Sequence, residues 1–186
     1  MNEQRFAPLT DDTMTPDQKR VVGNIWSTPR DGSLGLGPFN SLLRSPELAD
    51  RVQRVGEYLR FQSSLHARLT ELAILVTARK WTAQFEWWAH LPLALKAGLD
   101  PRIAEAISRG ERPATMDAEE TLVYEFSSEL LATGRVTDER YAGVREAFGE
   151  RGAIDLVGTL GYYGLISMVL NVDRCPIPRG GEAPLK

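Results

Sequence analysis

The stretch from Glu71 to His90, ELAILVTARKWTAQFEWWAH, constrains the fold of this chain more than any other. It overlaps the segment 69–78, LTELAILVTA, which is apolar around nearly the whole circumference of a helix. Helices of that kind are buried in a protein core. A carboxylate inside such a helix is costly unless it has a polar partner. The stretch therefore predicts a helical core that encloses the side chain of Glu71.

Glu86 and His90 stand four residues apart in the second half of this stretch. Side chains at that spacing project from the same face of a helix and can touch each other. Their neighbours are apolar, so no face of this turn is clearly solvated. An imidazole in a low-dielectric site beside a carboxylate can hold a proton near neutral pH, which suits general acid/base chemistry. A buried acid beside such a pair is a candidate functional site.

Each of these side chains also has a simpler explanation. Exposed ion pairs four residues apart are common on helix surfaces and contribute only about 0.3–0.5 kcal/mol. Glu71 is equally well explained as a core acid that pairs with Arg68 or Arg79. The sequence alone leaves both alternatives open.

Other conspicuous side chains favour structural roles. Trp81, Trp87 and Trp88 are more typical of core or interface packing than of a platform for a substrate. His66 is expected to face solvent near the start of a helix. Cys175 is the single cysteine, so the chain has no intramolecular disulfide, and this thiol is expected to be unreactive.

No segment alternates apolar and polar residues convincingly enough to be a strand, so the sequence predicts an all-α fold in a single domain spanning 1–186. An extended arm is expected at 1–14, an irregular tail at 176–186, and a mobile lid in the glycine- and proline-rich loop 28–38. The predicted helices are 16–27, the short turn 39–43, 46–61, 65–81, 83–97, 101–109, 118–133, 138–148 and 154–172.

Capping residues mark several of these helix boundaries. Thr15 precedes a proline at the first helical position, and Asp117 is followed three residues later by Glu120, which is a capping box. Ser64 and Thr82 are predicted to begin the helices that carry Glu71 and His90. In the helix 46–61, the apolar side chains predict one buried face, formed by Leu48, Val52, Val55 and Leu59.

Composition and charge exclude some classes of function. A chain of 186 residues with 42% hydrophobic content can bury a proper core. A net charge of −3 provides no basic field for phosphate backbones, so nucleic acid is not expected as a partner. The N-terminus has no apolar segment of the signal-peptide type, and cysteine is scarce, so we expect a cytoplasmic protein.

The segment 154–172, IDLVGTLGYYGLISMVLNV, approaches the length of a transmembrane span. Asp155 lies inside it, so we expect a buried helix and no membrane association. Glycines recur at every third position, at Gly158, Gly161 and Gly164. They leave one face of the helix without side chains, so that another helix can approach closely. A helix that is apolar all round is buried in a core or between subunits, so we expect a homo-oligomer.

Metal binding is a further possibility for the same residues. Two carboxylates and one imidazole can form a facial triad, and Glu71, Glu86 and His90 supply that set. The pattern lacks the dense ligand spacing of motifs such as HExxH, so no metal is predicted.

The spacing of these residues resembles the carboxymuconolactone decarboxylase-like superfamily, which includes the AhpD-type alkylhydroperoxidases. Peroxidase members have a Glu, eleven residues, a CxxC motif, three residues and a His. In this chain the same frame contains Glu71, Ala83, Glu86 and His90. Both cysteines are replaced, and thiol peroxidases need a nucleophilic thiolate and a resolving thiol. The resemblance therefore points to the decarboxylase-type branch and against peroxidase activity.

The resemblance implies an all-α, AhpD-like helical bundle that assembles into trimers or hexamers, with the active site near the subunit contacts. It also implies that no metal or organic cofactor is needed. The expected activity is decarboxylation, or a related proton-transfer reaction, of a small carboxylated lactone or a similar unsaturated acid. His90 is the expected general acid, Glu86 holds it, and Glu71 orients it or relays the proton.

The substrate is expected to lie in an apolar pocket formed by Phe85, Trp88 and Tyr162. Arg60, at the end of a predicted helix, is the candidate to bind a second substrate carboxylate, although its position is more typical of a solvated helix end. Two other classes of function remain as alternatives. One is a non-catalytic helical oligomer that binds a small ligand, and the other is a metalloenzyme that uses the Glu/Glu/His set.

Overall fold

Eight α-helices make up the regular structure of this protein in a computed structural model that describes residues 3–29, 37–178 and 183–185. No strand occurs in these ranges, which confirms the predicted all-α class. The helices are α1 (Pro16–Trp26), α2 (Phe39–Leu42), α3 (Pro46–Phe61), α4 (Ala67–Trp81), α5 (Gln84–Lys96), α6 (Pro101–Ser108), α7 (Ala118–Thr133) and α8 (Asp138–Asp173). The predicted lid loop falls mostly on residues outside the described ranges.

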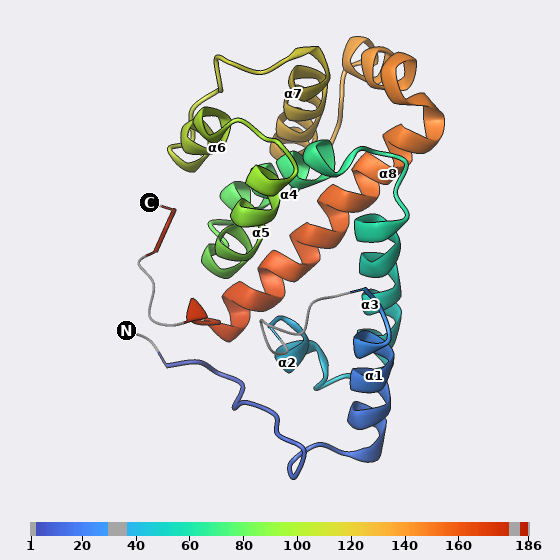
Figure 1. Cartoon of the computed structure of the whole chain (residues 1–186), viewed down its shortest axis with the longest axis vertical. Helices are drawn as coiled ribbons and strands as arrows, with labels where there is room; N and C mark the ends of the chain where they lie inside the picture. The colour runs from blue at the N-terminus through green and yellow to red at the C-terminus, as the bar shows by residue number, and fades with distance from the viewer. Residues whose placement is uncertain (1–2, 30–36, 179–182, 186) are drawn as a thin grey trace.

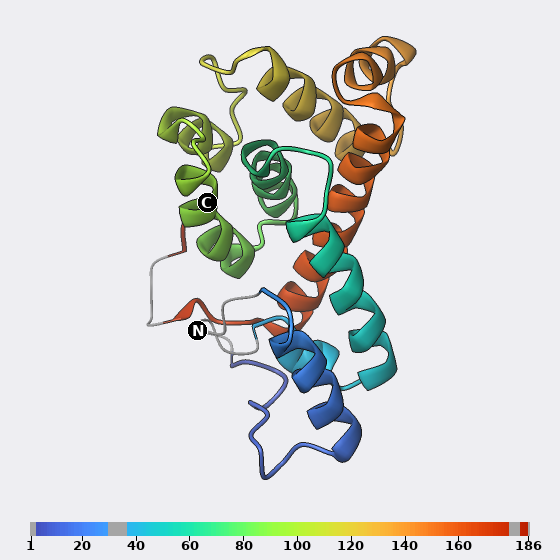
Figure 2. The ribbon, with the colours of Figure 1, turned by 45° about the vertical axis from the view of Figure 1, so that its right-hand side comes forward.

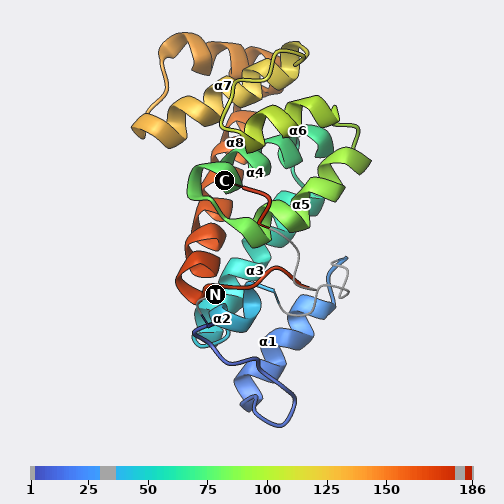
Figure 3. The same cartoon turned by 90° about the vertical axis from the view of Figure 1, so that its left-hand side faces the viewer.

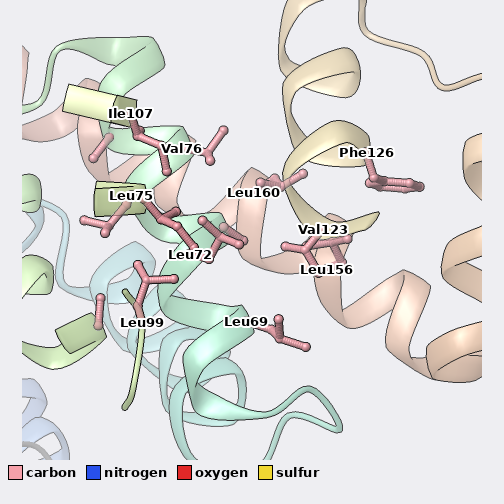
Figure 4. Close-up of a cluster of buried hydrophobic side chains, with 14 of the residues drawn as sticks. Leu69, Leu72, Leu75, Val76, Leu99, Ile107, Val123, Phe126, Leu156 and Leu160 are labelled. Carbon is pink, nitrogen blue, oxygen red and sulfur yellow. The ribbon is translucent and has the colours of Figure 1, made fainter. Parts of the chain in front are cut away.

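Helix α4 forms the centre of the larger hydrophobic core, as its nearly uniform apolar character predicts. It packs against α5, α6, α7 and α8, and every residue from Leu69 to Ala78 is buried. Each Leu or Ile side chain buried in this way stabilises the fold by about 1.5–3 kcal/mol. Figure 4 shows part of this cluster, with side chains from α4 facing those of α7 and α8; it includes Leu69, Leu72, Leu75, Val76, Leu99, Ile107, Val123, Phe126, Leu156 and Leu160.

A second hydrophobic cluster joins α1, α2 and α3 to the C-terminal part of α8. Its buried members include Val21, Ile25, Leu43, Val52, Phe85, Ile166 and Leu170. Helix α8 runs diagonally between the two groups of helices in both Figure 1 and Figure 2. Helices α6 and α7 lie at the end of the molecule opposite α1 (Figure 3). Both α8 and α5 contribute to the two cores, α5 through Phe85 in the second cluster and Trp87 in the first.

Helix α8 contains one break, at Gly149, whose φ of 71° and ψ of 176° are not helical. The break separates the two predicted helices, 138–148 and 154–172, and produces the sharp bend in Figure 1. By length and composition α8 is able to cross a membrane, but 61% of its most apolar window is buried inside the protein. Core helices of globular proteins give the same pattern.

The predicted caps at Thr15 and at Asp117 with Glu120 are confirmed, each as a reciprocal capping box. The prediction for Ser64 is wrong, because His66 caps α4 by accepting a hydrogen bond from the backbone N–H of Arg68. The Ser64 backbone N–H and hydroxyl both donate to the buried Asp155 carboxylate, at 2.8 and 2.7 Å. Ser64 therefore bonds to the carboxylate of Asp155, which is distant in the sequence, and does not cap α4.

The prediction for Thr82 is also wrong. Thr82 ends α4 in a left-handed conformation, with a φ of 48°, and Ala83 begins α5 without a side-chain cap. Only these two residues separate α4 from α5. The tight corner brings the inner face of α5 directly against α4.

The predicted apolar face of α3 is only partly correct. Val52 and Leu59 are buried, but Leu48 and Val55 are 47% and 50% exposed. Gly56 is buried instead, because the Tyr162 side chain of α8 packs directly against its backbone. Close contact with a large aromatic side chain therefore decides which face of α3 points inward.

The described part of the N-terminal arm, residues 3–14, has no helix or strand and makes a turn at residues 11–13 before α1, and two buried polar side chains hold it. The Asp173 carboxylate accepts hydrogen bonds from the Phe6 backbone N–H at 2.8 Å and from the Ser41 hydroxyl at 2.6 Å. The Asn40 side chain accepts from the Leu9 backbone N–H at 2.8 Å. These contacts tie the arm to α2 and to the end of α8.

Candidate functional site

The corner between α4 and α5 brings Glu71 beside the pair predicted on α5. The Nδ1 atom of His90 lies 2.7 Å from Oε2 of Glu71, and its Nε2 atom lies 3.0 Å from Oε1 of Glu86. Each ring nitrogen therefore has its own carboxylate partner. The structure brings together the three residues that the sequence singled out, and it excludes the alternative of an exposed Glu86–His90 ion pair.

All three side chains are withdrawn from solvent. The exposed fraction of the side chain is 5% for Glu86, 8% for His90 and 12% for Glu71. Burial by itself lowers the pKa of His90, but the charges and hydrogen bonds of Glu71 and Glu86 outweigh it and raise that pKa from 6.5 to about 9. His90 is therefore an imidazolium at neutral pH, with its Nδ1–H donating to Glu71 and its Nε2 forming an ion pair with Glu86.

The alternative partners of Glu71 are placed elsewhere. Arg68 forms ion pairs with Asp117, at 2.8 Å, and with Glu120. Arg79 forms no ion pair with any described residue, and its Nε atom is buried without a hydrogen bond. Glu71 is thus the partner of His90 rather than a core acid held by an arginine.

Tyr163 of α8 completes the surroundings of the imidazole, and sequence reasoning missed it. Its ring contacts the His90 ring edge to face, with centroids 4.9 Å apart and an interplanar angle of 82°. Burial raises the pKa of Tyr163 well above 10, partly offset by the charge of Arg60, so the phenol is neutral. The sequence pattern could have identified it, because Tyr163 falls at helical spacing on the same buried face of α8 as Leu156, Leu160 and Leu170.

Tyr162, the tyrosine chosen from the sequence, lies one position around the helix and is half-buried. Its ring packs against Tyr163 with centroids 5.0 Å apart, and its hydroxyl end lies against Gly56 of α3. Tyr162 thus packs against the tyrosine that touches His90.

The remaining predicted substrate residues lie around this core. Phe85 is buried, and its ring is 5.8 Å from that of the half-buried Trp88. Arg60 is half-buried at the end of α3, close enough to Tyr163 for its charge to influence that phenol. No ion pair joins Arg60 to any residue in the described part of the chain. Its guanidinium lies over the Phe61 ring, 5.2 Å from the centroid.

Cys175 lies on the same side of the protein, in the cluster that contains Phe85. Burial, together with the negative charges of Asp173 and Glu86, raises the pKa of its thiol from 9 to about 11. The thiol is therefore protonated at neutral pH. A protonated thiol is a poor nucleophile, in agreement with the unreactive cysteine expected from the sequence.

The arrangement is poorly suited to a facial metal triad. The two carboxylates bind opposite nitrogens of one imidazole, so their oxygens do not converge with a ring nitrogen on a common point. Across the described ranges, no group of three His, Cys, Asp or Glu side chains is placed to hold a metal ion. The geometry instead favours movement or storage of a proton along Glu71, His90 and Glu86.

No protein-family model and no curated protein matches this sequence. The resemblance described above therefore depends on the spacing of Glu71, Ala83, Glu86 and His90 within the chain.

Proposed function

We propose that this protein is a cofactor-independent proton-transfer enzyme of the carboxymuconolactone decarboxylase type, built on an AhpD-like bundle. Its substrate is a small carboxylated lactone or a related unsaturated acid. The observation that supports this proposal is the buried imidazole of His90, hydrogen-bonded to Glu71 through Nδ1 and ion-paired with Glu86 through Nε2. A proton stored on a buried imidazole suits the protonation of a substrate carbon.

The route of the proton follows from these contacts. Both N–H groups of the imidazolium are occupied, so His90 has no free N–H to offer a substrate directly. The proton reaches the substrate through a carboxylate, and Glu71 is the more exposed of the two, at 12% against 5% for Glu86. Glu71 is therefore the group that faces the substrate, His90 stores the proton, and Glu86 fixes the orientation of the ring.

The reaction balances with these groups alone. The bond between the substrate carbon and its carboxylate breaks, CO2 leaves, and the electron pair moves into a conjugated carbonyl of the substrate. Glu71 then passes a proton from His90 to the substrate carbon, and water restores the proton to the site. Positioned acid catalysis of this kind contributes about a hundredfold to ten-thousandfold to the rate.

The residues around this site provide both apolar surface and a positive charge, which suits a small substrate acid with an apolar part. Phe85, Trp88 and Tyr163 provide apolar surface, which disfavours a carboxylate relative to neutral CO2. Arg60 has a guanidinium without an ion pair among the described residues, and its planar fork suits a second substrate carboxylate.

A second copy of this chain is the partner that we propose. Apolar residues recur every three or four positions along the exposed face of α8, namely Ile154 (69% exposed), Val157, Leu165, Met168 and Val172. Gly161 lies on the same face, and a Cβ atom added to it would meet open space. Such a stripe suits helix packing between subunits in a trimer or hexamer. We also propose a cytoplasmic location, with no role for nucleic acid.

The direct test is to screen purified protein against carboxylated lactones and related unsaturated acids, measuring CO2 release. Activity on one class is expected, together with a loss of at least a hundredfold in His90→Gln. The matched control is His66→Asn, which changes the other histidine and keeps a good helix cap. Activity that survives in His90→Gln contradicts the proposed role of the imidazole.

A further inference from the structure

Arg79 lies in the last turn of α4 and has no ion-pair partner among the residues that the structure describes. Its Nε atom is buried without a hydrogen bond, and no ion pair joins its guanidinium to a described residue. Arg68, on the same helix, shows the usual arrangement, with ion pairs to Asp117 and Glu120. Arg79 is half-buried, and leaving a buried N–H such as its Nε–H without an acceptor is costly, so an anionic ligand at this guanidinium would be favoured.

Arg79 lines a pocket of about 170 Å³ formed by residues of α4, α6, α7 and the turn after α6. Helices α6 and α7 lie towards one end of the molecule in Figure 3. The apolar part of the lining comes from Val76, Ile107 and Leu131. Three residues that carry hydrogen-bond donors also line it, namely Lys80, Tyr124 and Ser128. The pocket thus combines a cationic end with an apolar surface.

The one carboxylate in the lining is already engaged. Oε2 of Glu111 accepts hydrogen bonds from Nε and Nη2 of Arg109, at 3.0 and 2.9 Å. The Arg79 guanidinium instead lies against the turn after α6, where a Cβ atom on Gly110 would come within 3.2 Å of Nη2. Neighbouring acids therefore leave Arg79 available to a ligand.

We propose that this pocket binds a small monocarboxylate with an apolar body, of the benzoate class. The planar guanidinium matches a carboxylate in a two-point contact. A cavity of about 150 Å³ is large enough to hold benzene, so the volume suits one ring. The site is separate from the proposed catalytic site, because Arg79 is eight residues from Glu71, or about 12 Å along α4.

The test is isothermal titration of the purified protein with benzoate, and with benzamide as a neutral ligand of the same shape. We expect benzoate to bind, and Arg79→Met to bind it about tenfold or more weakly, because a charge-assisted hydrogen bond is lost. Arg102→Gln, which removes an exposed arginine of α6, is the control and should bind benzoate as the wild type does. Benzamide binding as tight as that of benzoate overturns the proposal.

Two further measurements keep the test decisive if Arg79→Met does not fold. Backbone amide spectra of the wild type should show benzoate shifting the signals of Gly110 and Ser128, and shifts confined to other regions overturn the proposal. His90→Gln should keep its affinity for benzoate, whereas loss of binding in that variant places the ligand at His90 instead. Inorganic phosphate that binds as tightly as benzoate refutes the assignment to an apolar carboxylate.

Discussion

The raised pKa of His90 predicts a specific loss of stability at alkaline pH. A group whose pKa is higher in the folded state stabilises the fold fully below its unfolded pKa, and this stabilisation disappears as the pH rises through the folded value. For His90 these two values are 6.5 and about 9. The stabilisation is therefore present at pH 6 and mostly lost at pH 9.

The magnitude follows from the same two values. A tenfold change in a proton-binding constant corresponds to about 1.4 kcal/mol, so the rise from 6.5 to about 9 corresponds to about 3 kcal/mol. The side chain of His90 is only 8% exposed, so solvent screens this interaction little. For a domain of this size that amount is a substantial part of the total free energy of unfolding.

The assay is urea unfolding of wild type and His90→Gln at intervals from pH 6 to pH 9. The free energy of unfolding of the wild type should fall by about 3 kcal/mol more than that of His90→Gln over this range. The thiol of Cys175 and the phenol of Tyr163 also have raised pKa values, but they act above pH 9 and are present in both proteins. Equal pH dependence of the two proteins refutes the bridged imidazolium.

Three other substitutions test separate parts of the structure. Gly56→Ala places a methyl group 2.1 Å from the hydroxyl oxygen of Tyr162, so urea unfolding should show a loss of about 1–3 kcal/mol; unchanged stability contradicts the packing of α3 on α8. Asp155→Asn weakens the contacts of this carboxylate with Ser64 and Tyr58, and the same assay should show a loss of about 2 kcal/mol, whereas no loss contradicts its anchoring role. Ile154→Glu puts a charge on the exposed stripe of α8, and sedimentation should show smaller particles than for the wild type; an unaltered oligomer rules out this face as the interface.

Local sequence signals predicted most of the helices. The capping boxes at Thr15 and Asp117 need only residues three positions away, so they can be recognised without tertiary information. Glycine at 149 marks the break in α8 for a similar reason, since its φ of 71° disfavours other residues. These signals predicted where α1 and α7 begin and where α8 is broken.

The failures come from partners distant in the sequence. Ser64 has the chemistry of a helix cap, but its hydroxyl bonds to Asp155, which is 91 positions away. The exposure of Leu48 and Val55 depends on the close packing of Tyr162 on Gly56. Local patterns contain no information about such contacts.

In the candidate site, too, local contacts could be predicted from the sequence and contacts between separate helices could not. The contact between Glu86 and His90 follows from their spacing on one helix, and the cost of a bare carboxylate in a core helix predicted that Glu71 had a partner. The choice between Tyr162 and Tyr163 depends on the rotation of α8 against α5. Spacing in two separate helices does not determine that rotation, so the tyrosine that touches His90 was missed.

The nitrogen NMR spectrum of the imidazole rings tests the central claim most directly. The chain has only two histidines, so His66→Asn leaves His90 as the sole source of these signals. At pH 7 both nitrogens of His90 should be protonated, and titration should give a pKa of about 9. A neutral ring with one bare nitrogen at pH 7, or a pKa at or below 6.5, contradicts an imidazolium held between Glu71 and Glu86.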